Sequence, residues 1–499
     1  MKKNNDQINS KDPFMKRFFK GVTNSGEIKN TNPTNGTRFN GNGLRIRGSK
    51  QEKDFLVTMA KGLEKNNSID TAYYGKYDVK RGLRNANGTG VVVGLTKVGD
   101  VSGYRTNEKN EKIPIEGKLY YRGIDVEDLV RHATKENRFG YEEASYLLLF
   151  GDLPTQKQLE AYKSTLSARR ELPSGFPRDM ILVAPSNSVM NKLARSVLAL
   201  YSYDDKADDV SIPNVIRQSI DLIGYFPSLI AYGFQAKRSH YHNESLHLHY
   251  PAPDKSTAEN ILRMIRPTGE YSDLEAKLLD LSMILHAEHG GGNNSTFATH
   301  LVTSTGTDTY SVIAAAVGAL KGPKHGGANV EVINMISDLK SNVKDITNHK
   351  EVEKYLIRLL KGEAFNGSGL IYGLGHAVYT LSDPRATLLK AMAKKLAEDK
   401  ELIDDFMLYD FIEKRGSELF REMKKTDKPI PANVDLYSGF VYNALNIPID
   451  IATPLFAASR ISGWCAHRIE ELVAGGKLMR PAYINVQEKR EYIPLTKRV

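Results

Sequence analysis

Helical patterns cover almost all of the chain after residue 125, and they restrict the possible fold more than any other feature. The stretch Tyr141–Phe150 carries two glutamates in its first turn and is followed by Gly151, as expected of a buried helix with a glycine stop. Between Ser272 and His286, apolar residues recur every three or four positions, which places them on one helix face. Further helical patterns cover residues 155–169, 188–201, 214–234 and 258–265. The sequence therefore predicts a mainly α fold.

Two short segments before this region have strand rather than helix character. Residues 90–100 (GVVVGLTKVGD) are rich in β-branched side chains, and residues 118–125 (KLYYRGID) follow after a polar turn. Such residues favour an extended backbone. We expect the two segments to form a small N-terminal β-hairpin.

The composition is that of a soluble globular protein. The 499 residues are 40% hydrophobic and 26% charged, which fits a large core and two or more domains. Cys465 is the only cysteine, so an intrachain disulfide and a multi-cysteine zinc site are both excluded. No apolar run reaches the roughly 18 residues of a membrane span, and the N-terminus lacks the apolar core of a secretory signal. These features predict a cytoplasmic protein with no membrane partner.

Most of the positive charge lies in the first 50 residues. The whole chain has a net charge of +10, and residues 1–50 hold seven Lys and four Arg against two Asp and one Glu, a net charge of +8. With nine Asn as well, this tail has too little apolar surface to fold alone. We expect a disordered tail or an arm laid over a partner subunit, and no nucleic-acid partner. The alternative is a membrane or nucleic-acid anchor built on Phe14, Phe18 and Phe19.

A glycine-rich turn at residues 321–329 (KGPKHGGAN) has the composition of a catalytic loop. Pro323 suits the start of a helix, and Gly326 and Gly327 let backbone N–H groups approach a bound group closely. A histidine beside a helix start is favoured in its neutral form and can donate a hydrogen bond to a developing oxyanion. His325 is therefore a candidate for stabilising an enol. The alternative is a glycine turn with an incidental histidine.

Two other groups of histidines invite a zinc interpretation. Residues 239–249 contain four of the twelve histidines, but no carboxylate or cysteine stands at the spacing of a known motif, so we expect an exposed loop. His286 and His289 could share a helix face, with His300 as a third ligand. Alternatively, His289 projects from a helix end, loosened by three glycines, into a polar cleft. We predict no metal site.

The last third of the chain adds further polar candidates. His376 follows two spaced glycines in GLGHAVYTLSDPRA, where Arg385 could grip a carboxylate with its planar fork. Asp435, in PANVDLYSG, could be a helix cap or a base. Arg460 and Arg480 lie near otherwise apolar helices.

Taken in order, these stretches resemble the citrate synthase family. The matching segments are HAEHGGGNNS, GPKHGGAN, GLGHAVYTLSDPRA, PANVDLYSG, SR at 459–460, RP at 480–481 and, upstream, GKLYYRGIDVEDL and EEASYLLLFGDLP. Each motif is short, but an ordered set of this many is specific. The resemblance extends from residue 90 to the C-terminus and leaves out the N-terminal tail.

The resemblance implies a condensation of acetyl-CoA with oxaloacetate, as in the tricarboxylic acid cycle, and a role for each motif residue. In the family, the histidine matching His325 hydrogen-bonds the thioester carbonyl, and the aspartate matching Asp435 removes a methyl proton. The histidine matching His376 polarises the ketone. The groups that hold the substrate carboxylates match His289, Arg385, Arg460 and Arg480. The last of these is contributed by the neighbouring subunit, which implies a homodimer. No cofactor is implied, because the chemistry needs neither redox nor metal.

The resemblance also implies how CoA is bound. Family members bind it largely through backbone of the GxGH loop, here Gly373 and Gly375, and through basic residues that meet its phosphates. Lys424, Lys425 and Lys428 are candidates for those contacts, and a solvated loop is the alternative.

Two positions depart from the family pattern. Thr380 stands where the family often has a basic residue that contacts CoA phosphate, and Glu288 stands where it has an aspartate. Neither change affects the three residues assigned to proton transfer and ketone activation.

The implied architecture is a large helical domain interrupted by a small one. We expect the large domain at 51–326 and 450–499, the small domain at 327–449, and the site in the cleft between them, where closure excludes water. One alternative is a 2-methylcitrate synthase that uses propionyl-CoA; the two acyl groups differ by a methylene, which discriminates by only about 1–3 kcal/mol. Another is an inactive binding or structural paralogue.

Overall fold

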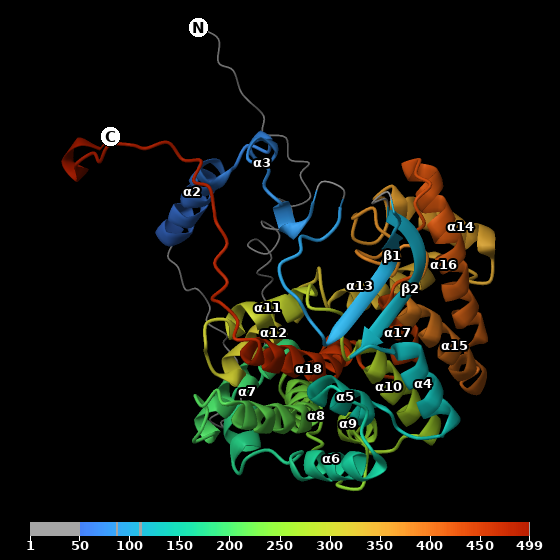
Figure 1. Cartoon of the computed structure of the whole chain (residues 1–499). Coiled ribbons are helices and arrows are strands. Elements are labelled where there is room, and N and C mark those ends of the chain that lie inside the picture. Colours follow the sequence, from blue (N-terminus) through green and yellow to red (C-terminus); the bar gives the residue numbers. More distant parts are fainter. Residues whose placement is uncertain (1–49, 86–87, 109–111, 499) are drawn as a thin grey trace, which may run out of the picture. The chain divides into compact units, whose positions relative to one another are not determined.

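The computed structural model describes residues 50–85, 88–108 and 112–498 (Figure 1). The chain divides into two compact units, Met1–Arg81 and Gly82–Val499. The described part of the first unit contains the helices α2 (Lys50–Asn67) and α3 (Ala72–Lys76). The predicted disordered tail or subunit arm at 1–50 lies, apart from its last residue, outside the described part of the chain.

The second unit is almost wholly helical, which confirms the predicted mainly α fold. Its helices are α4 (Val126–Lys135), α5 (Tyr141–Phe150), α6 (Gln156–Ala168), α7 (Val189–Leu200), α8 (Ile212–His242), α9 (Thr257–Ile265), α10 (Asp273–His286), α11 (Asn294–Thr303), α12 (Thr309–Leu320), α13 (Ala328–Asn342), α14 (His349–Leu360), α15 (Pro384–Asp399), α16 (Ile403–Lys424), α17 (Val434–Ala444) and α18 (Ile449–Val473). Single turns of tighter or wider helix lie at Arg81–Leu83, Pro177–Leu182, Tyr201–Tyr203 and Leu495–Lys497.

Local sequence signals explain where several helices begin. Ser272 accepts a hydrogen bond from the backbone of Glu275, whose side chain bonds back to Ser272, so α10 starts with a capping box. Ser256 and Glu259 make the same pair at the start of α9. The sequence predicted the α10 pattern from Ser272 onward and the α9 pattern from Ala258, one residue after the observed start of α9 at Thr257.

The core of the second unit is built around α18. This helix is buried from Ile451 to Ile469, and it packs against α8, α5, α11 and α10 (Figure 1). A helix that is buried on every side has to carry apolar residues all round. A charged residue within it, such as Arg460, is therefore held in a fixed, water-poor position.

A second group of helices runs from α13 to α17. The helices of this group pack on one another, α15 against α17 and α16, α13 against α17, and α14 against α16 (Figure 1). They correspond to the predicted small domain at 327–449. The division into large and small domains stays a prediction, because Gly82–Val499 forms one compact unit.

The small sheet is antiparallel and lies later in the chain than predicted. Its strands are β1 (Gly99–Thr106), β2 (Lys112–Tyr121) and β3 (Ile124–Asp125), in the order β1-β2-β3. β1 pairs with β2 from Gly99 opposite Tyr121 to Thr106 opposite Lys112. The predicted first strand at 90–100 was therefore wrong. Val92 and Leu95 are 86% and 95% exposed, so this run has strand propensity but no strand beside it among the described residues.

The segment at 239–249 is only partly the loop that the sequence predicted. The expected loop at 239–249 begins as helix, since α8 continues to His242 and ends at Asn243 in the left-handed conformation; beyond that point it is a loop.

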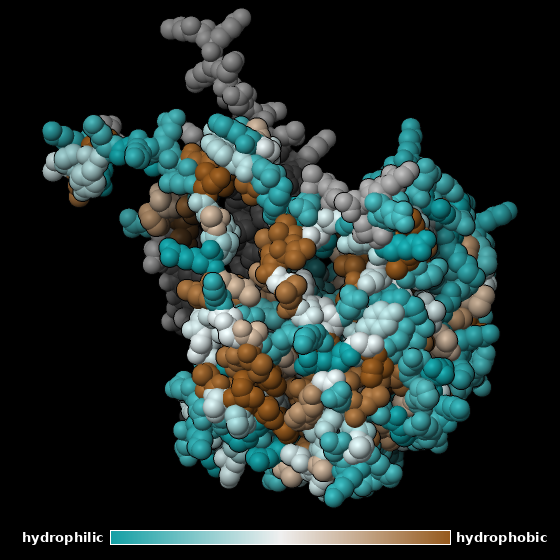
Figure 2. Space-filling view, in the orientation of Figure 1, coloured by the Kyte–Doolittle hydropathy of each residue, from teal (hydrophilic) through white to brown (hydrophobic). Residues whose placement is uncertain are grey.

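Figure 2 shows a largely hydrophilic surface over the α14–α16 side, with separate hydrophobic patches elsewhere on the visible face. Among the described residues no helix is both long and apolar enough to cross a membrane.

Candidate active site

The His325 turn connects α12 to α13 and is tightly packed. A Cβ at Gly326 would lie 2.6 Å from the Leu320 carbonyl oxygen, and one at Gly327 would lie 2.8 Å from the Pro323 Cα. Either contact is closer than non-bonded atoms allow, so both positions require glycine. Thr453 of α18 donates its hydroxyl to the Gly326 carbonyl at 3.0 Å. The turn is thus fastened to the central helix.

The surroundings of His325 fix which ring nitrogen carries the proton. The backbone N–H of Ser295 donates to His325 Nε2 at 3.4 Å, and the Ser295 hydroxyl lies 3.0 Å from the same atom. Because a backbone amide can only donate, Nε2 is the acceptor and Nδ1 carries the hydrogen. Burial, with Arg460 nearby, lowers the pKa of His325 to about 4. The ring is therefore a neutral hydrogen-bond donor at physiological pH.

The His376 loop has a backbone that only glycines adopt readily. Gly373 and Gly375 have φ values of 91° and 86°, and a Cβ at Gly373 would lie 2.9 Å from the Leu436 side chain. Asn433 bonds to this loop twice, from its backbone N–H to the Gly373 carbonyl and from its side-chain amide to the Gly375 carbonyl, both at 2.9 Å. The loop is therefore tied to the start of α17.

The tautomer of His376 is also set by backbone donors. The N–H groups of Val378 and Tyr379 both lie 3.0 Å from His376 Nδ1, so Nδ1 accepts and Nε2 carries the hydrogen. Burial and the nearby charge of Arg385 lower the pKa of His376 to about 4. His376, like His325, is neutral and can donate one hydrogen bond to a ligand.

Asp435 lies in the first turn of α17. The helix cap is the neighbouring Asn433, whose side chain accepts from the Asp435 backbone at 3.0 Å; the interpretation of Asp435 as a cap is therefore wrong. Burial raises the pKa of Asp435 to about 6, although Arg385 opposes the shift. A carboxylate whose pKa is close to neutrality is suited to accept a proton from carbon.

Two polar atoms beside His376 lack partners. The His289 ring centroid lies 5.2 Å from that of His376 and 5.5 Å from that of Tyr379. His289 Nε2 and the Tyr379 hydroxyl are buried and have no hydrogen-bond partner among the described residues. Burial, followed by the charge of Arg385, holds the pKa of His289 well below its ordinary value. Unpaired buried donors of this kind are unfavourable unless a ligand satisfies them.

Arg460 presents the strongest unsatisfied donors of the site. It is fully buried in α18, and its Nε donates to the His286 carbonyl at 2.6 Å. Its Nη1 and Nη2 atoms find no partner in the described part of the chain. Burial lowers the pKa of Arg460 to about 10. A guanidinium held out of water with both terminal nitrogens free is a receptor for a carboxylate.

Arg385 is paired with a neighbour that the sequence analysis did not single out. Its Nε and Nη2 donate to the two carboxylate oxygens of Asp383 at 3.0 and 2.7 Å, and both residues are buried. Asp383 also accepts from the backbone of Val434 at 3.2 Å, which links α15 to α17. The pair fixes Arg385 beside His376 and Asp435, whose pKa values its charge influences.

The remaining predicted site residues lie on the surface. Lys424, Lys425 and Lys428 are exposed, at and just after the end of α16, and Arg480 is exposed in the segment that follows α18. Arg480 is therefore not gathered with the other arginines within one chain. The alternative metal triad of His286, His289 and His300 does not assemble, because His286 bonds to Ser282 within α10, while His289 faces His376 and His300 faces His467.

Four contributors escaped the sequence analysis. Tyr379 packs against both His289 and His376, and Asp383 orients Arg385. Ser295 contacts the His325 ring, and the Trp464 ring nitrogen donates to the Ser295 hydroxyl at 3.1 Å. Tyr379 and Asp383 stand within the GLGHAVYTLSDPRA motif, so their position was a usable signal. Ser295 ends the HAEHGGGNNS motif and had the same kind of signal. No local signal pointed to Trp464, which meets Ser295 only in the fold.

These groups define a helical acid–base enzyme for a small anionic substrate, because neutral histidine donors and a free guanidinium surround a carboxylate that titrates near neutrality. A family model, described as the citrate synthase C-terminal domain, matches residues 86–482. The chain belongs to the citrate synthase family.

Individual relatives agree with this placement. A citrate synthase of Haloferax volcanii is 33% identical over 430 residues, covering 84% of this chain and 99% of the relative. A 2-methylcitrate synthase of Shewanella oneidensis is 31% identical, covering 76% of this chain and 92% of the relative. Among solved structures, the ternary complex of carboxymethyl coenzyme A and oxaloacetate with citrate synthase of Thermoplasma acidophilum has a TM-score of 0.69 at 27% identity, covering 84% of this chain and 99% of that one.

Proposed function

We propose that the protein condenses acetyl-CoA with oxaloacetate and hydrolyses the product to citrate and CoA. The observation that carries this proposal is the combination of Asp435, with a pKa of about 6, and the free Nη1 and Nη2 atoms of Arg460. A carbon acid needs a base of this kind, and a dicarboxylate needs a guanidinium that no protein carboxylate occupies.

In the first step Asp435 accepts a proton from the acetyl methyl group. Nδ1–H of His325 donates to the thioester oxygen as negative charge develops there, so the enol forms without a full charge on oxygen. His325 has a pKa of about 4 and is therefore neutral at physiological pH. It acts as a neutral hydrogen-bond donor and not as an imidazolium acid.

In the second step the enol carbon attacks the ketone carbon of oxaloacetate. Nε2–H of His376 donates to the ketone oxygen, which takes up the electron pair of the breaking C=O π bond. This oxygen gains one proton to become the citryl hydroxyl, which balances the methyl proton that Asp435 accepted and later gives up. Arg385, Arg460 and His289 hold the two carboxylates, and the Tyr379 hydroxyl is a further donor on the same side. Water then cleaves the citryl thioester, releasing citrate and the thiol of CoA.

The CoA group is proposed to bind along the His376 loop. Gly375 of this loop lies next to the Ile430 side chain. Ile430, Pro431 and Arg421 line a pocket of about 320 Å³. Lys428 precedes this pocket in the chain, and Lys424 and Lys425 precede Lys428. Their exposure suits contacts with phosphate groups at the protein surface. Arg421 adds a positive charge that compensates for Thr380.

The proposed site draws on both predicted domains. His376, Arg385 and Asp435 come from 327–449, and His289, His325 and Arg460 come from the sequence on either side. Closure of the predicted small domain on the predicted large domain would exclude water from the site until condensation is complete.

We also propose a homodimer in which Arg480 completes the site of the neighbouring subunit. In support, the segment after α18 exposes large apolar side chains, with Tyr483 95% and Tyr492 82% exposed, as a segment that packs on a partner does. Arg480→Ala and Asp435→Asn chains should each be inactive alone and should regain activity when mixed and re-paired, because one site of the mixed dimer is complete. No recovery in verified mixed dimers would contradict the shared arginine. The cytoplasmic location predicted from the sequence stays part of this proposal.

Thiol release from acetyl-CoA in the presence of oxaloacetate tests the activity directly. We expect turnover in the full-length protein, and a loss of about 10²–10⁴-fold in Asp435→Asn. No release by the full-length protein would favour an inactive paralogue. Running the assay with propionyl-CoA decides between the two enzyme types, because a higher kcat/KM for propionyl-CoA would identify a 2-methylcitrate synthase.

A further inference from the structure

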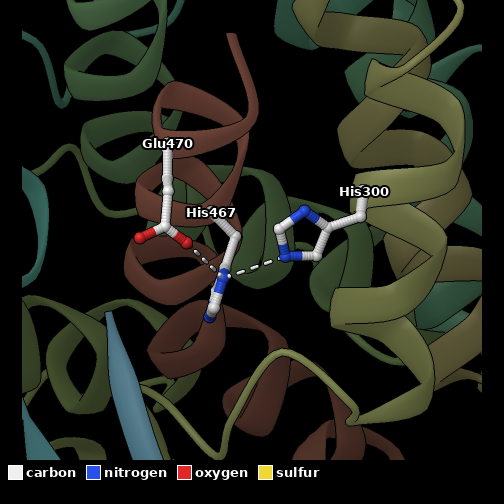
Figure 3. A group of neighbouring side chains, drawn as sticks. All are labelled: His300, His467 and Glu470. Carbon is white, nitrogen blue, oxygen red and sulfur yellow. Dashed lines mark hydrogen bonds and ion pairs between the residues drawn. The ribbon is translucent and has the colours of Figure 1, made fainter. Parts of the chain in front are cut away.

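Outside the proposed active site, two buried histidines face each other across α11 and α18. His300 Nε2 lies 3.1 Å from His467 Nδ1, and the side chains are 8% and 0% exposed. Figure 3 shows both rings, with Glu470 beside His467 on α18. The Glu470 Oε2 atom lies 3.8 Å from His467 Nδ1. These three ligand atoms all lie within 4.8 Å of one another.

The outward nitrogens of both rings are bound by carboxylates. His300 Nδ1 lies 2.8 Å from Glu471 Oε2, and His467 Nε2 lies 2.9 Å from Glu288 Oε1. A carboxylate requires an N–H on the nitrogen that it contacts, so in neutral rings the hydrogens lie on His300 Nδ1 and His467 Nε2. His300 Nε2 and His467 Nδ1, which face each other, then both carry a lone pair and no hydrogen. Two lone pairs at this distance repel unless a cation or an extra proton lies with them.

The carboxylate of Glu470 points to the same place. Its Oε1 accepts from the backbone N–H of Lys97 at 2.6 Å, whereas its Oε2 is buried without a hydrogen-bond partner among the described residues. Glu288 Oε2 is likewise unpartnered. Three carboxylates surround the histidine pair. Two cations interact with them: Arg122 with Glu288 and Glu470, and Arg460 with Glu288. The local charge is therefore negative.

Space beside the histidine pair is kept open by a glycine. A Cβ at Gly291 would lie 3.6 Å from His300 Nε2 and 3.7 Å from His467 Cε1, with Thr96 3.8 Å away on the other side. Any longer side chain at this position would press on the nitrogen lone pairs.

We propose that His300 Nε2, His467 Nδ1 and Glu470 Oε2 bind a divalent transition-metal ion of the Zn²⁺ class, with water as a further ligand. Two imidazoles and a carboxylate are a donor set that suits zinc. Glu471 and Glu288 supply the outer hydrogen bonds that orient metal-binding imidazoles and raise their basicity. The ion joins α11 to α18 and steadies the glycine segment that follows His289. It takes no part in the condensation itself, so the reaction remains free of metal chemistry.

The competing occupant is a proton. One of the two rings would then be an imidazolium sharing its hydrogen with the other, and no metal would bind. The experiment has to separate these two outcomes, and it also has to exclude binding at His240 and His242, which are exposed at the end of α8.

Metal content and affinity test the proposal on the full-length chain, prepared without a histidine tag. After dialysis against Zn²⁺ and removal of the excess, elemental analysis should find about one ion per chain, and Co²⁺ in its place should give the intense visible absorption of a four-coordinate site. Absence of Zn²⁺ binding at micromolar concentration overturns the proposal and indicates the shared proton. This measurement needs no variant, so it stands even if a substituted chain fails to fold.

Variants locate the ion. Glu470→Gln and His300→Asn should each weaken Zn²⁺ binding by about 100-fold or more, since each removes a ligand. The matched control is the double variant His240→Asn/His242→Asn, which should bind as the unaltered chain does. Loss of the ion in the control, or unchanged affinity in both ligand variants, overturns the assignment. Circular dichroism establishes that each variant is folded.

Discussion

Arg385 donates two hydrogen bonds to Asp383, at 3.0 and 2.7 Å, in a buried pair that also accepts the backbone N–H of Val434. The same carboxylate therefore orients a proposed substrate-binding arginine and joins α15 to the helix that carries Asp435. This arrangement makes the pair important for stability as well as for binding.

Removing the Asp383 carboxylate should destabilise the fold. In Asp383→Ala a buried guanidinium loses its partner, and we expect a loss of about 3–5 kcal/mol in the free energy of unfolding, measured by urea denaturation. The control is Asn348→Ala, which removes only the cap of α14 and should cost about 1 kcal/mol. If the Asp383 variant is no less stable than this control, the pair does not stabilise the fold.

The pH dependence of kcat/KM should report Asp435. The base acts only when ionised, and its pKa is about 6, so activity should fall about tenfold per unit below pH 6. His325 and His376, with pKa values of about 4, stay neutral over this range and add no limb between pH 5 and 8. A flat profile from pH 8 down to pH 5 would contradict the assignment.

The same carboxyl group should destabilise the free protein at neutral pH. Its pKa is about 6 when folded against an ordinary value of 3.8, so the folded chain binds the proton more tightly than the unfolded chain. Stability is therefore lost as pH rises from about 4 to about 6. We expect Asp435→Asn to raise the free energy of unfolding at pH 7 by about 2–3 kcal/mol. The gain should vanish near pH 3.5, and a gain of equal size at both pH values would point to another cause.

Arg460 should matter for the ligand more than for the fold. The two terminal nitrogens of Arg460 are buried without partners among the described residues, and an apolar side chain of similar length removes that desolvation cost. Arg460→Met should therefore not lower the melting temperature of the free protein. Oxaloacetate should stabilise the unaltered chain, by about 2.7 kcal/mol at 100 times its Kd, and should leave the variant unaffected. An equal thermal shift in both proteins would remove Arg460 from the binding site.

Tyr379 offers a test of a residue identified from the structure. Its hydroxyl is buried without a partner, so Tyr379→Phe should leave the free protein as stable as before and weaken oxaloacetate binding by about tenfold. The control is Tyr162→Phe, whose hydroxyl bonds to Ser145 at 2.7 Å. That variant should lose about 1 kcal/mol of stability and bind normally. The opposite pattern would exclude Tyr379 from the site.

The sequence predicted the parts of this molecule that depend on local signals. Apolar residues at spacings of three and four marked helices such as the one after Ser272, and glycine-rich motifs marked the turns that present His325 and His376. The strand was misplaced because β-branched residues at 91–93 indicate propensity, whereas a strand also needs a neighbouring strand. The neighbour, β2, ends at Tyr121 opposite Gly99, so its pairing does not reach residues 91–93.

Features that depend on distant residues were not predictable in this way. The free nitrogens of Arg460 follow from the burial of α18, and the meeting of His300 with His467 joins positions 167 residues apart. Asp435 could not be separated from a cap, because Asn433 and Asp435 are both good capping types and only the fold shows which one accepts the bond.

Asn433 has a consequence for how the enzyme moves. Its one side chain bonds to the Gly375 carbonyl and to the Asp435 backbone, so Asp435 and the loop that carries His376 are held in a fixed relation to each other. In the proposed closure of the small helical group, these two residues would therefore approach Arg460 of α18 as one piece. The spacing between them is settled before any substrate arrives.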